Sequence, residues 1–142
     1  MSHDLKALSR RWFDEVSNDR RLDVVPELSH EHAVVYGLVG DGKPAKIADF
    51  IPFRERFLQT FPDFHIKVDD VIQEGDKTVV RLTATGTHEG DAMGIAPTGR
   101  RVNLSALIMT RWKDGKIIEA WNEFDAWGMM QQLTGPAAMK IK

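Results

Sequence analysis

Cysteine is absent from the sequence, which excludes disulfide bonds, thiolate metal sites and a cysteine nucleophile. Any chemistry must therefore come from carboxylates, histidines and hydroxyls. Long apolar runs are absent too: nowhere do about 18 apolar residues follow one another, and the opening stretch, MSHDLKALSRRWF, becomes charged at once. We therefore expect a cytoplasmic protein with no membrane partner.

A charge excess of either sign is also lacking. The 19 basic and 21 acidic side chains give a formal net charge of -2, and no basic cluster is longer than two residues. Nucleic acid is therefore not an expected partner. The sequence has no glycine-rich phosphate loop, no nucleophile elbow and no HExxH motif, so the nucleotide-binding, serine-hydrolase and zincin classes have no support.

A length of 142 residues suits one domain, so we expect residues 1–142 to fold as a single domain. Apolar residues recur at helical spacing over 5–16 and 47–61, and each stretch predicts an amphipathic helix. Shorter elements come between them: a helical piece at 22–28, a strand at 33–36 and a loop at 39–44. After Pro62 the period changes to two almost to the end of the chain. Helices followed by an antiparallel sheet define an α+β fold.

Two tight turns, Gly75-Asp76 and Asp114-Gly115, are expected to join neighbouring strands of this sheet. Counting outward from the first sets Asp70 opposite Arg81, which predicts a cross-strand ion pair. Counting from the second places one set of side chains on one face: Leu104, Ala106, Ile108, Trp121, Glu123 and Asp125. The opposite face carries Leu107, Met109, Ile118 and Phe124. Because that face is apolar as well, we expect a homodimer formed through it.

The stretch from Trp121 to Asp125 places two carboxylates at the end of an apolar strip. Desolvation there would raise a carboxyl pKa and provide an acid or base near neutral pH. The alternative is a strand end at which both Glu123 and Asp125 reach solvent.

A long connection, residues 87–99, contains three glycines, a proline and His88. Such a loop can cover a pocket mouth and place His88 over it. It can equally be a β-connection whose glycines only satisfy turn geometry. His30 and His32 point the same way in an extended chain, but no third ligand lies nearby in the sequence, so we expect no metal and no other cofactor.

Several short motifs run along nearly the whole chain: Asp63 to Asp70, Glu74 to Lys77, Thr85 to Gly90, Met93 to Ile95, Pro97 to Gly99, Asp114 to Ile117 and Trp121 to Asp125. Together they resemble the SnoaL-like polyketide cyclases, also called ester cyclases, of the NTF2-like superfamily. The resemblance implies a cone-shaped fold in which N-terminal helices pack on a curved antiparallel sheet and enclose one deep pocket. Characterised members close a ring of an aromatic polyketide by intramolecular aldol condensation, without metal or organic cofactor.

The resemblance also implies roles for particular residues. An aspartate on the last long strand is the acid/base of these cyclases, and Asp125 matches it best. Glu123, two residues earlier, is the second candidate, and His88 is the third, as a group that orients or polarises an oxygen. We expect the apolar walls that bind a small hydrophobic or aromatic ligand to include Trp12, Phe53, Phe57, Leu104, Ile108 and Trp121.

Other functions remain open on such a scaffold, because function belongs to the site rather than to the fold. An NTF2-like epoxide hydrolase or an isomerase is one alternative, and an isomerase would need a tyrosine donor, for which Tyr36 is the only tyrosine available. A non-catalytic module that binds a small molecule is the other.

Overall fold

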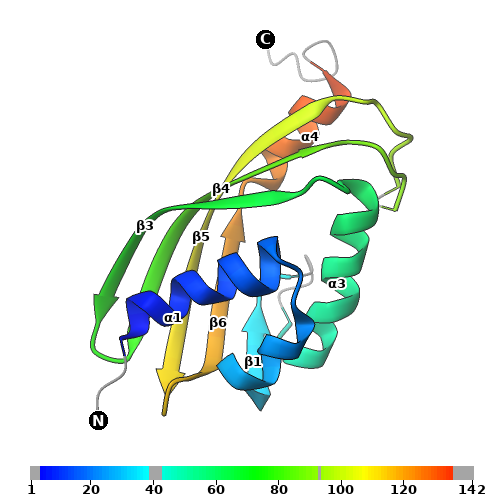
Figure 1. Ribbon diagram of the computed structural model, residues 1–142. Helices are drawn as coiled ribbons and strands as arrows, with labels where there is room; N and C mark the ends of the chain where they lie inside the picture. Colours follow the sequence, from blue (N-terminus) through cyan, green and yellow to red (C-terminus); the bar gives the residue numbers. More distant parts are fainter. Residues whose placement is uncertain (1–3, 39–42, 93, 136–142) are drawn as a thin grey trace.

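The alternating segments of the sequence form one curved sheet of six strands, in the order β2-β1-β6-β5-β4-β3 (Figure 1). The computed structural model describes residues 4–38, 43–92 and 94–135, so most of the loop predicted at 39–44 lies outside the described residues. The strands are β1 (Ser29–Tyr36), β2 (Ala45–Lys46), β3 (His65–Glu74), β4 (Lys77–Thr87), β5 (Arg101–Lys113) and β6 (Lys116–Phe124).

The sheet is mixed, where a wholly antiparallel one was expected. β1 runs parallel to β6, whereas the other neighbouring strands are antiparallel. A tight hairpin imposes antiparallel pairing, but β1 and β6 are separated by most of the chain, so their connection leaves either direction open. The expected α+β class is confirmed.

The helices are α1 (Leu5–Arg11), η1 (Trp12–Asn18), η2 (Leu22–Val24), α2 (Val25–Leu28), α3 (Ile47–Thr60) and α4 (Ala126–Thr134). Both long helices expected from the apolar spacing are present, the first beginning after its N-cap Asp4. Its second half, η1, is a π-helix, in which the N–H of Asp19 donates to the carbonyl of Asp14 at 2.9 Å. None of the described helices combines the length and apolar character needed to cross a membrane.

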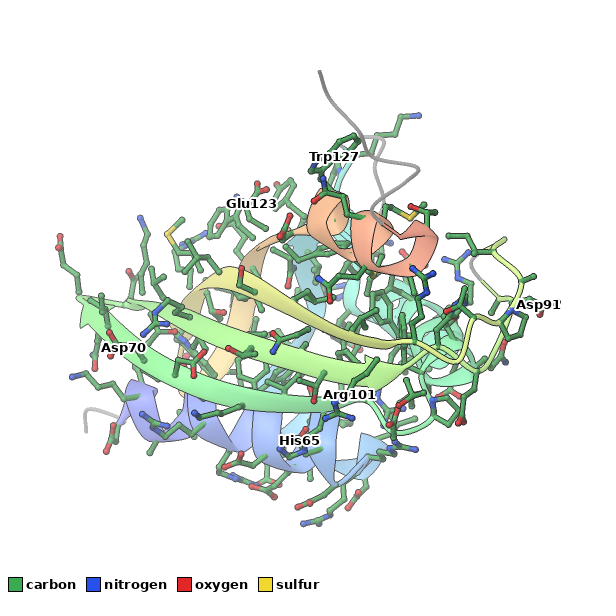
Figure 2. The ribbon with its side chains drawn as sticks, turned by 90° about the horizontal axis from the view of Figure 1, so that it is seen from above. His65, Asp70, Asp91, Arg101, Glu123 and Trp127 are labelled. Atoms are coloured by element: carbon green, nitrogen blue, oxygen red, sulfur yellow. The ribbon has the colours of Figure 1, made fainter. Side chains whose placement is uncertain are left out.

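The helices cover both sides of the sheet. Figure 1 shows α1 lying across one face, with α3 standing beside it, and α4 partly behind the strands. Viewed from above, α1 and α4 lie on opposite sides of the strands (Figure 2). The core fills the space between α1, α3 and the inner sheet face, where the buried side chains of alternating strand positions meet those of the helices.

Both expected hairpin turns are confirmed. Asp114 and Gly115 have φ values of 53° and 75°, as a type I′ turn requires at both central positions. Asp70 pairs with Arg81 in the β3-β4 register as predicted. The ion pair, however, forms between Arg81 and Asp69, at 3.9 Å. A register irregularity between Val68 and Asp70 makes Asp69 the extra residue there.

A second irregularity, in the β5-β6 hairpin, overturns the predicted faces. Trp112 pairs with Ile117 as expected, but Arg111 then pairs with Glu119, so Ile118 is an extra residue in β6. Because side chains alternate along a strand, one extra residue moves every later side chain to the other face. Asn122 and Phe124 therefore face inward. Trp121 and Glu123 share the outer face with Met109 and Leu107, contrary to the prediction.

α4 was not predicted, because the alternating pattern was expected to continue. The helix closes the edge of β5 beyond the point where β6 ends. The N–H of Asp125 donates to the carbonyl of Ser105 at 3.0 Å. The Gln132 side chain both accepts from the backbone N–H of Asn103 (2.7 Å) and donates to its carbonyl (2.8 Å). These hydrogen bonds satisfy backbone groups of β5 that would otherwise pair with a neighbouring strand.

Asp125 is the N-cap of α4 rather than a strand residue. Its Oδ1 accepts from the backbone N–H of Gly128 at 2.8 Å, and a Cβ added at Gly128 would overlap this carboxylate. The side chain is exposed and lies beyond the last residue of β6. Of the two alternatives for this carboxylate, burial in an apolar strip or contact with solvent, the structure agrees with the second.

We expect Asp125→Ala to lower the free energy of unfolding by about 1 kcal/mol, because it removes an N-cap acceptor. Asp125→Asn should cost much less, since asparagine caps a helix about as well as aspartate. Urea unfolding followed by circular dichroism measures both. Asp91→Ala, at an exposed loop aspartate, is the control. Equal stability of Asp125→Ala and the control would contradict the capping role.

Asp63 joins the turn after α3 to the end of β4. Its two carboxylate oxygens accept from the backbone N–H (2.6 Å) and the hydroxyl (2.8 Å) of Thr87. These hydrogen bonds, the backbone one foremost, hold the pKa of Asp63 below its ordinary value. The ionised carboxylate is thus a clamp that connects the turn before β3 to the end of β4, where the 88–100 loop begins.

This clamp should weaken in acid. Since the pKa is lower in the folded state, the carboxylate stabilises the fold at pH values above its pKa in the unfolded chain, which is about 4. This contribution to the free energy of unfolding is lost as the pH falls through the pKa of the folded state. Asp63 is 48% exposed, so we expect a share of only about 0.5–1 kcal/mol. Urea unfolding at pH 7 and pH 3 should show a smaller loss in acid for Asp63→Asn than for the unmodified protein, while Asp70→Asn keeps the full loss. An unchanged acid loss in Asp63→Asn would exclude the clamp.

Candidate active site

A cavity of about 150 Å³ lies between α1, η1, α3 and the inner sheet face. Eight aromatic side chains form much of its wall: Trp12, Phe13, Phe50, Phe53, Phe57, Phe64, Trp112 and Phe124. Five aliphatic side chains of β4 and β5 form the floor: Leu82, Ala84, Leu104, Ala106 and Ile108. A dry apolar cavity of this volume holds about one benzene-sized ring. The space therefore suits a small organic ligand.

Phe57, on α3, is the centre of the aromatic wall. Its ring lies 5.1 Å from that of Phe53, 5.5 Å from Phe64 and 6.3 Å from Phe124, measured between centroids. The last two contacts are edge-on, the arrangement that aromatic quadrupoles favour. Contacts from α3, β6 and the segment before β3 thus hold this wall in one shape.

The polar groups of the lining are few. They are the side chains of Ser9, Ser17, Arg54, Thr110 and Asn122, with Glu123 in addition. The hydroxyls of Ser9 and Thr78 are hydrogen-bonded at 2.9 Å, and the indole N–H of Trp112 donates to the hydroxyl of Thr78 at 3.0 Å. The polar group of Ser9 is therefore already satisfied from within the fold.

Asn122 enters the cavity lining because of the Ile118 bulge. Its Nδ2 donates to the backbone carbonyl of Tyr36 at 2.9 Å, which fixes the amide between β6 and β1. The two strands approach closely here: a Cβ at Gly37 would collide with the carbonyl oxygen of Asn122. With Nδ2 engaged, the amide oxygen is the acceptor that Asn122 has left for other groups.

Arg54 is the one positively charged residue of the described cavity lining, and it is 8% exposed. It occupies the apolar stripe of α3, at the spacing Ile47, Phe50, Arg54, Phe57 and Phe61. Sequence reasoning missed this residue. The signal that could have identified it is a basic residue at a position of the helix where the spacing predicts an apolar one.

Of the two predicted carboxylates, Glu123 belongs to the cavity lining and Asp125 does not, within the described part of the chain. Glu123 is nevertheless exposed, and Figure 2 shows it on the same side of the sheet as Trp127, away from α1. Glu123 therefore borders the cavity at its rim, with its side chain on the outer sheet face. Asp125 caps α4 further along the chain.

His88 is fully buried, but it is not among the described lining residues. Its Nδ1 accepts from the backbone N–H of Thr98 at 3.2 Å and lies 3.0 Å from the hydroxyl of the same residue. The other ring nitrogen, Nε2, is buried without a hydrogen-bond partner in the described residues. The backbone N–H of His88 donates to the carbonyl of Arg100 at 2.8 Å. His88 thus holds the two ends of its loop together.

Five of the six apolar residues expected to bind ligand line the cavity: Trp12, Phe53, Phe57, Leu104 and Ile108. Trp121 does not, because the bulge turns it to the outer face, where its ring stacks on that of Tyr36 at a centroid distance of 5.8 Å. Tyr36 is likewise outside the described lining. In residues 4–38, 43–92 and 94–135, no three His, Asp or Glu side chains are grouped so that they could hold a metal ion.

Comparison with known proteins agrees with this architecture. The structure of IdmH from Streptomyces antibioticus, assigned as a polyketide cyclase, is 31% identical, with a TM-score of 0.85 over 94% of this chain and 100% of that one. AclR from Streptomyces galilaeus, assigned as a hydroxylase, is 28% identical, with a TM-score of 0.81 over 96% of this chain and 83% of its own. No curated protein matches the chain significantly. The sequence profile of the SnoaL-like polyketide cyclases matches residues 7–133, and the chain therefore belongs to this family.

Proposed function

We propose that this protein closes a ring in a small organic substrate by an intramolecular aldol reaction, with no metal or organic cofactor. The observation that carries the proposal is the apolar cavity, with few polar groups, in a member of the SnoaL-like polyketide cyclase family. IdmH, whose structure the chain resembles at 31% identity, is assigned as a polyketide cyclase. A site of this kind binds by shape and orients by a few polar contacts.

The reaction needs one acid/base and a folded substrate. A carboxylate removes a proton from the carbon beside one substrate carbonyl, and the resulting enolate attacks a second carbonyl of the same molecule. A carbon–carbon bond forms, the second carbonyl becomes an alkoxide, and the carboxylic acid returns the proton to it. Holding both reacting carbons in contact converts the encounter into a near-unimolecular step, which the aromatic walls favour.

Glu123 is the better placed of the two carboxylates. It is the one carboxylate among the described lining residues, whereas Asp125 is engaged as the cap of α4. The Glu123 side chain points to the outer sheet face, so the acid/base role requires the reacting carbon of the ligand to extend from the cavity to the rim at the end of β6. His88 then acts indirectly, since its hydrogen bonds to Thr98 shape the 88–100 loop.

Ligand binding without turnover is the second candidate function. One observation favours it: no carboxylate in the described residues is both buried and part of the cavity lining. The isomerase alternative is weaker, because Tyr36 stacks on Trp121 outside the described lining. Recovery of a co-purifying ligand unchanged after incubation would favour binding alone.

We expect Glu123→Gln to lower turnover by on the order of 10²–10⁴, the usual contribution of general acid–base catalysis, with little change in ligand affinity. The measurement is single-turnover conversion of a substrate identified by mass spectrometry of molecules that co-purify with the protein. Asp125→Asn is the matched control, because it removes a neighbouring carboxylate and keeps the helix cap. A larger loss in Asp125→Asn would transfer the role to Asp125. Full turnover in both variants would refute a carboxylate acid/base.

We also propose that the protein is a cytoplasmic homodimer joined through the outer sheet face. Five apolar side chains form a row across this face, one from each strand from β1 to β3 in the order of the sheet: Tyr36, Trp121, Met109, Val79 and Ile72. Ile72 is 60% exposed and Leu107, next to the row, is 51% exposed. An exposed apolar patch of this kind is typical of a subunit interface.

Sedimentation should give a mass of roughly twice the 16.1 kDa of one chain at micromolar concentration. Met109→Asp places a charge in the middle of the row, so we expect it to shift the protein to monomer. Arg10→Asp, at an exposed position of α1, changes the charge on the other side of the sheet and should leave the dimer intact. A monomeric unmodified protein would rule out this interface.

A further inference from the structure

Arg54 has more hydrogen-bond donors than the fold uses. Its Nη1 donates to Glu55 Oε1 at 3.1 Å and its Nη2 to the backbone carbonyl of Val16 at 3.3 Å. Nε is buried and has no hydrogen-bond partner in the described residues. A guanidinium carries five N–H donors and remains charged in proteins, so Arg54 enters the cavity wall as an incompletely paired cation.

The surroundings do not compensate for this charge. Burying a guanidinium costs free energy unless it is paired and hydrogen-bonded. The carboxylate of Glu55 is 50% exposed and therefore largely solvated. The other cavity residues of α3 and η1 are apolar except Ser17, and none of them carries a negative charge. A ligand in the cavity could therefore supply a partner to the guanidinium N–H groups that the described residues leave unpaired.

We propose that Arg54 binds an anionic oxygen of the ligand, so that the ligand class is a small ring compound bearing a carboxylate or an ionised enol or phenol. The inference rests on the proposed function only in that the cavity is taken as the ligand site. An acidic oxygen held by a guanidinium in a low-dielectric wall forms a charge-assisted hydrogen bond, which is stronger than one between neutral groups. The same contact would hold an enolate in place during ring closure.

A purely structural role for Arg54 makes a different prediction. Its bond to Val16 ties α3 to η1, so substitution would then change stability and the affinity for every ligand alike. A ligand-binding role changes the preference between a charged ligand and a neutral one of the same shape. The preference, measured as a ratio of two dissociation constants on one protein, is insensitive to a uniform loss of affinity.

The probes are 4-methylbenzoate and 4-methylbenzamide, which share a single ring and differ in charge. In NMR titrations at neutral pH we expect the unmodified protein to bind the benzoate about tenfold more tightly, as one hydrogen bond to a charged group allows. Arg54→Gln should bring the two affinities within about twofold of each other, again from the loss of that bond. Arg56→Gln, at an exposed position of the same helix, should keep the preference.

A third probe, 4-nitrophenol, distinguishes an ionised phenol or enol from a carboxylate. Its anion absorbs visible light, so the pKa of the bound probe can be read by spectrophotometric titration. A nearby cation should lower that pKa by about one unit or more relative to the free phenol. Arg54→Gln should abolish the shift, and Arg54→Lys, which keeps the charge but not the planar fork, should retain part of it.

The proposal is overturned if Arg54→Gln still prefers the benzoate. It is also overturned if the unmodified protein shows no benzoate preference and does not shift the pKa of bound 4-nitrophenol. A benzoate preference alone supports a carboxylate ligand, and a nitrophenol shift alone supports an enol or phenol. None of these outcomes depends on turnover. If Glu123→Gln leaves turnover intact while Arg54→Gln loses the charge preference, the proposed acid/base fails and the anion site stands.

Discussion

One extra residue, Ile118, decides which side chains of the last strand meet the ligand cavity. Because a strand alternates between two faces, the bulge puts Asn122 and Phe124 inside and leaves Trp121 and Glu123 outside. Phe124 then completes the aromatic wall around Phe57. A β6 strand without the bulge would face the cavity with a carboxylate and an indole, and the site would be a different one.

The cavity combines an apolar wall with one buried cation. Arg54 lies on the apolar stripe of α3, where a leucine would pack at lower cost in desolvation. Its charge is incompletely paired within the described structure, and real proteins break such packing rules mainly at functional sites. Shape and one charged contact together would select for small acidic ring compounds.

The 88–100 loop is fixed to the cavity wall at its base. The backbone N–H groups of Glu89 and Gly90 donate to the carbonyl of Thr60 at the end of α3, and a Cβ at Gly90 would collide with the carbonyl oxygen of Gln59. His88 and Asp63 hold the two sides of this junction. The position of α3, and with it Phe57 and Arg54, therefore depends on contacts outside the cavity.

The sequence alone determined the features that depend on local pattern. Helical spacing located α1 and α3, the Asp114-Gly115 pair set the tight turn, and the motifs along the chain identified the family. Trp12, Phe53 and Phe57 were found because periodicity places each of them on the apolar face of its own helix.

The tertiary structure decided those features that depend on a one-residue shift in strand register or on contacts between segments that are distant in sequence. The bulge at Ile118 cannot be recognised from the alternation of apolar and polar residues, because β6 is apolar on both faces. Asp125 was expected in a strand, but it is the N-cap of α4, a helix that the sequence pattern did not predict. The environment of Arg54 required η1 to pack beside α3, so that the carbonyl of Val16, 38 residues away in sequence, could reach it. Burial and charge pairing are set by contacts between elements, and a local pattern carries no information about them.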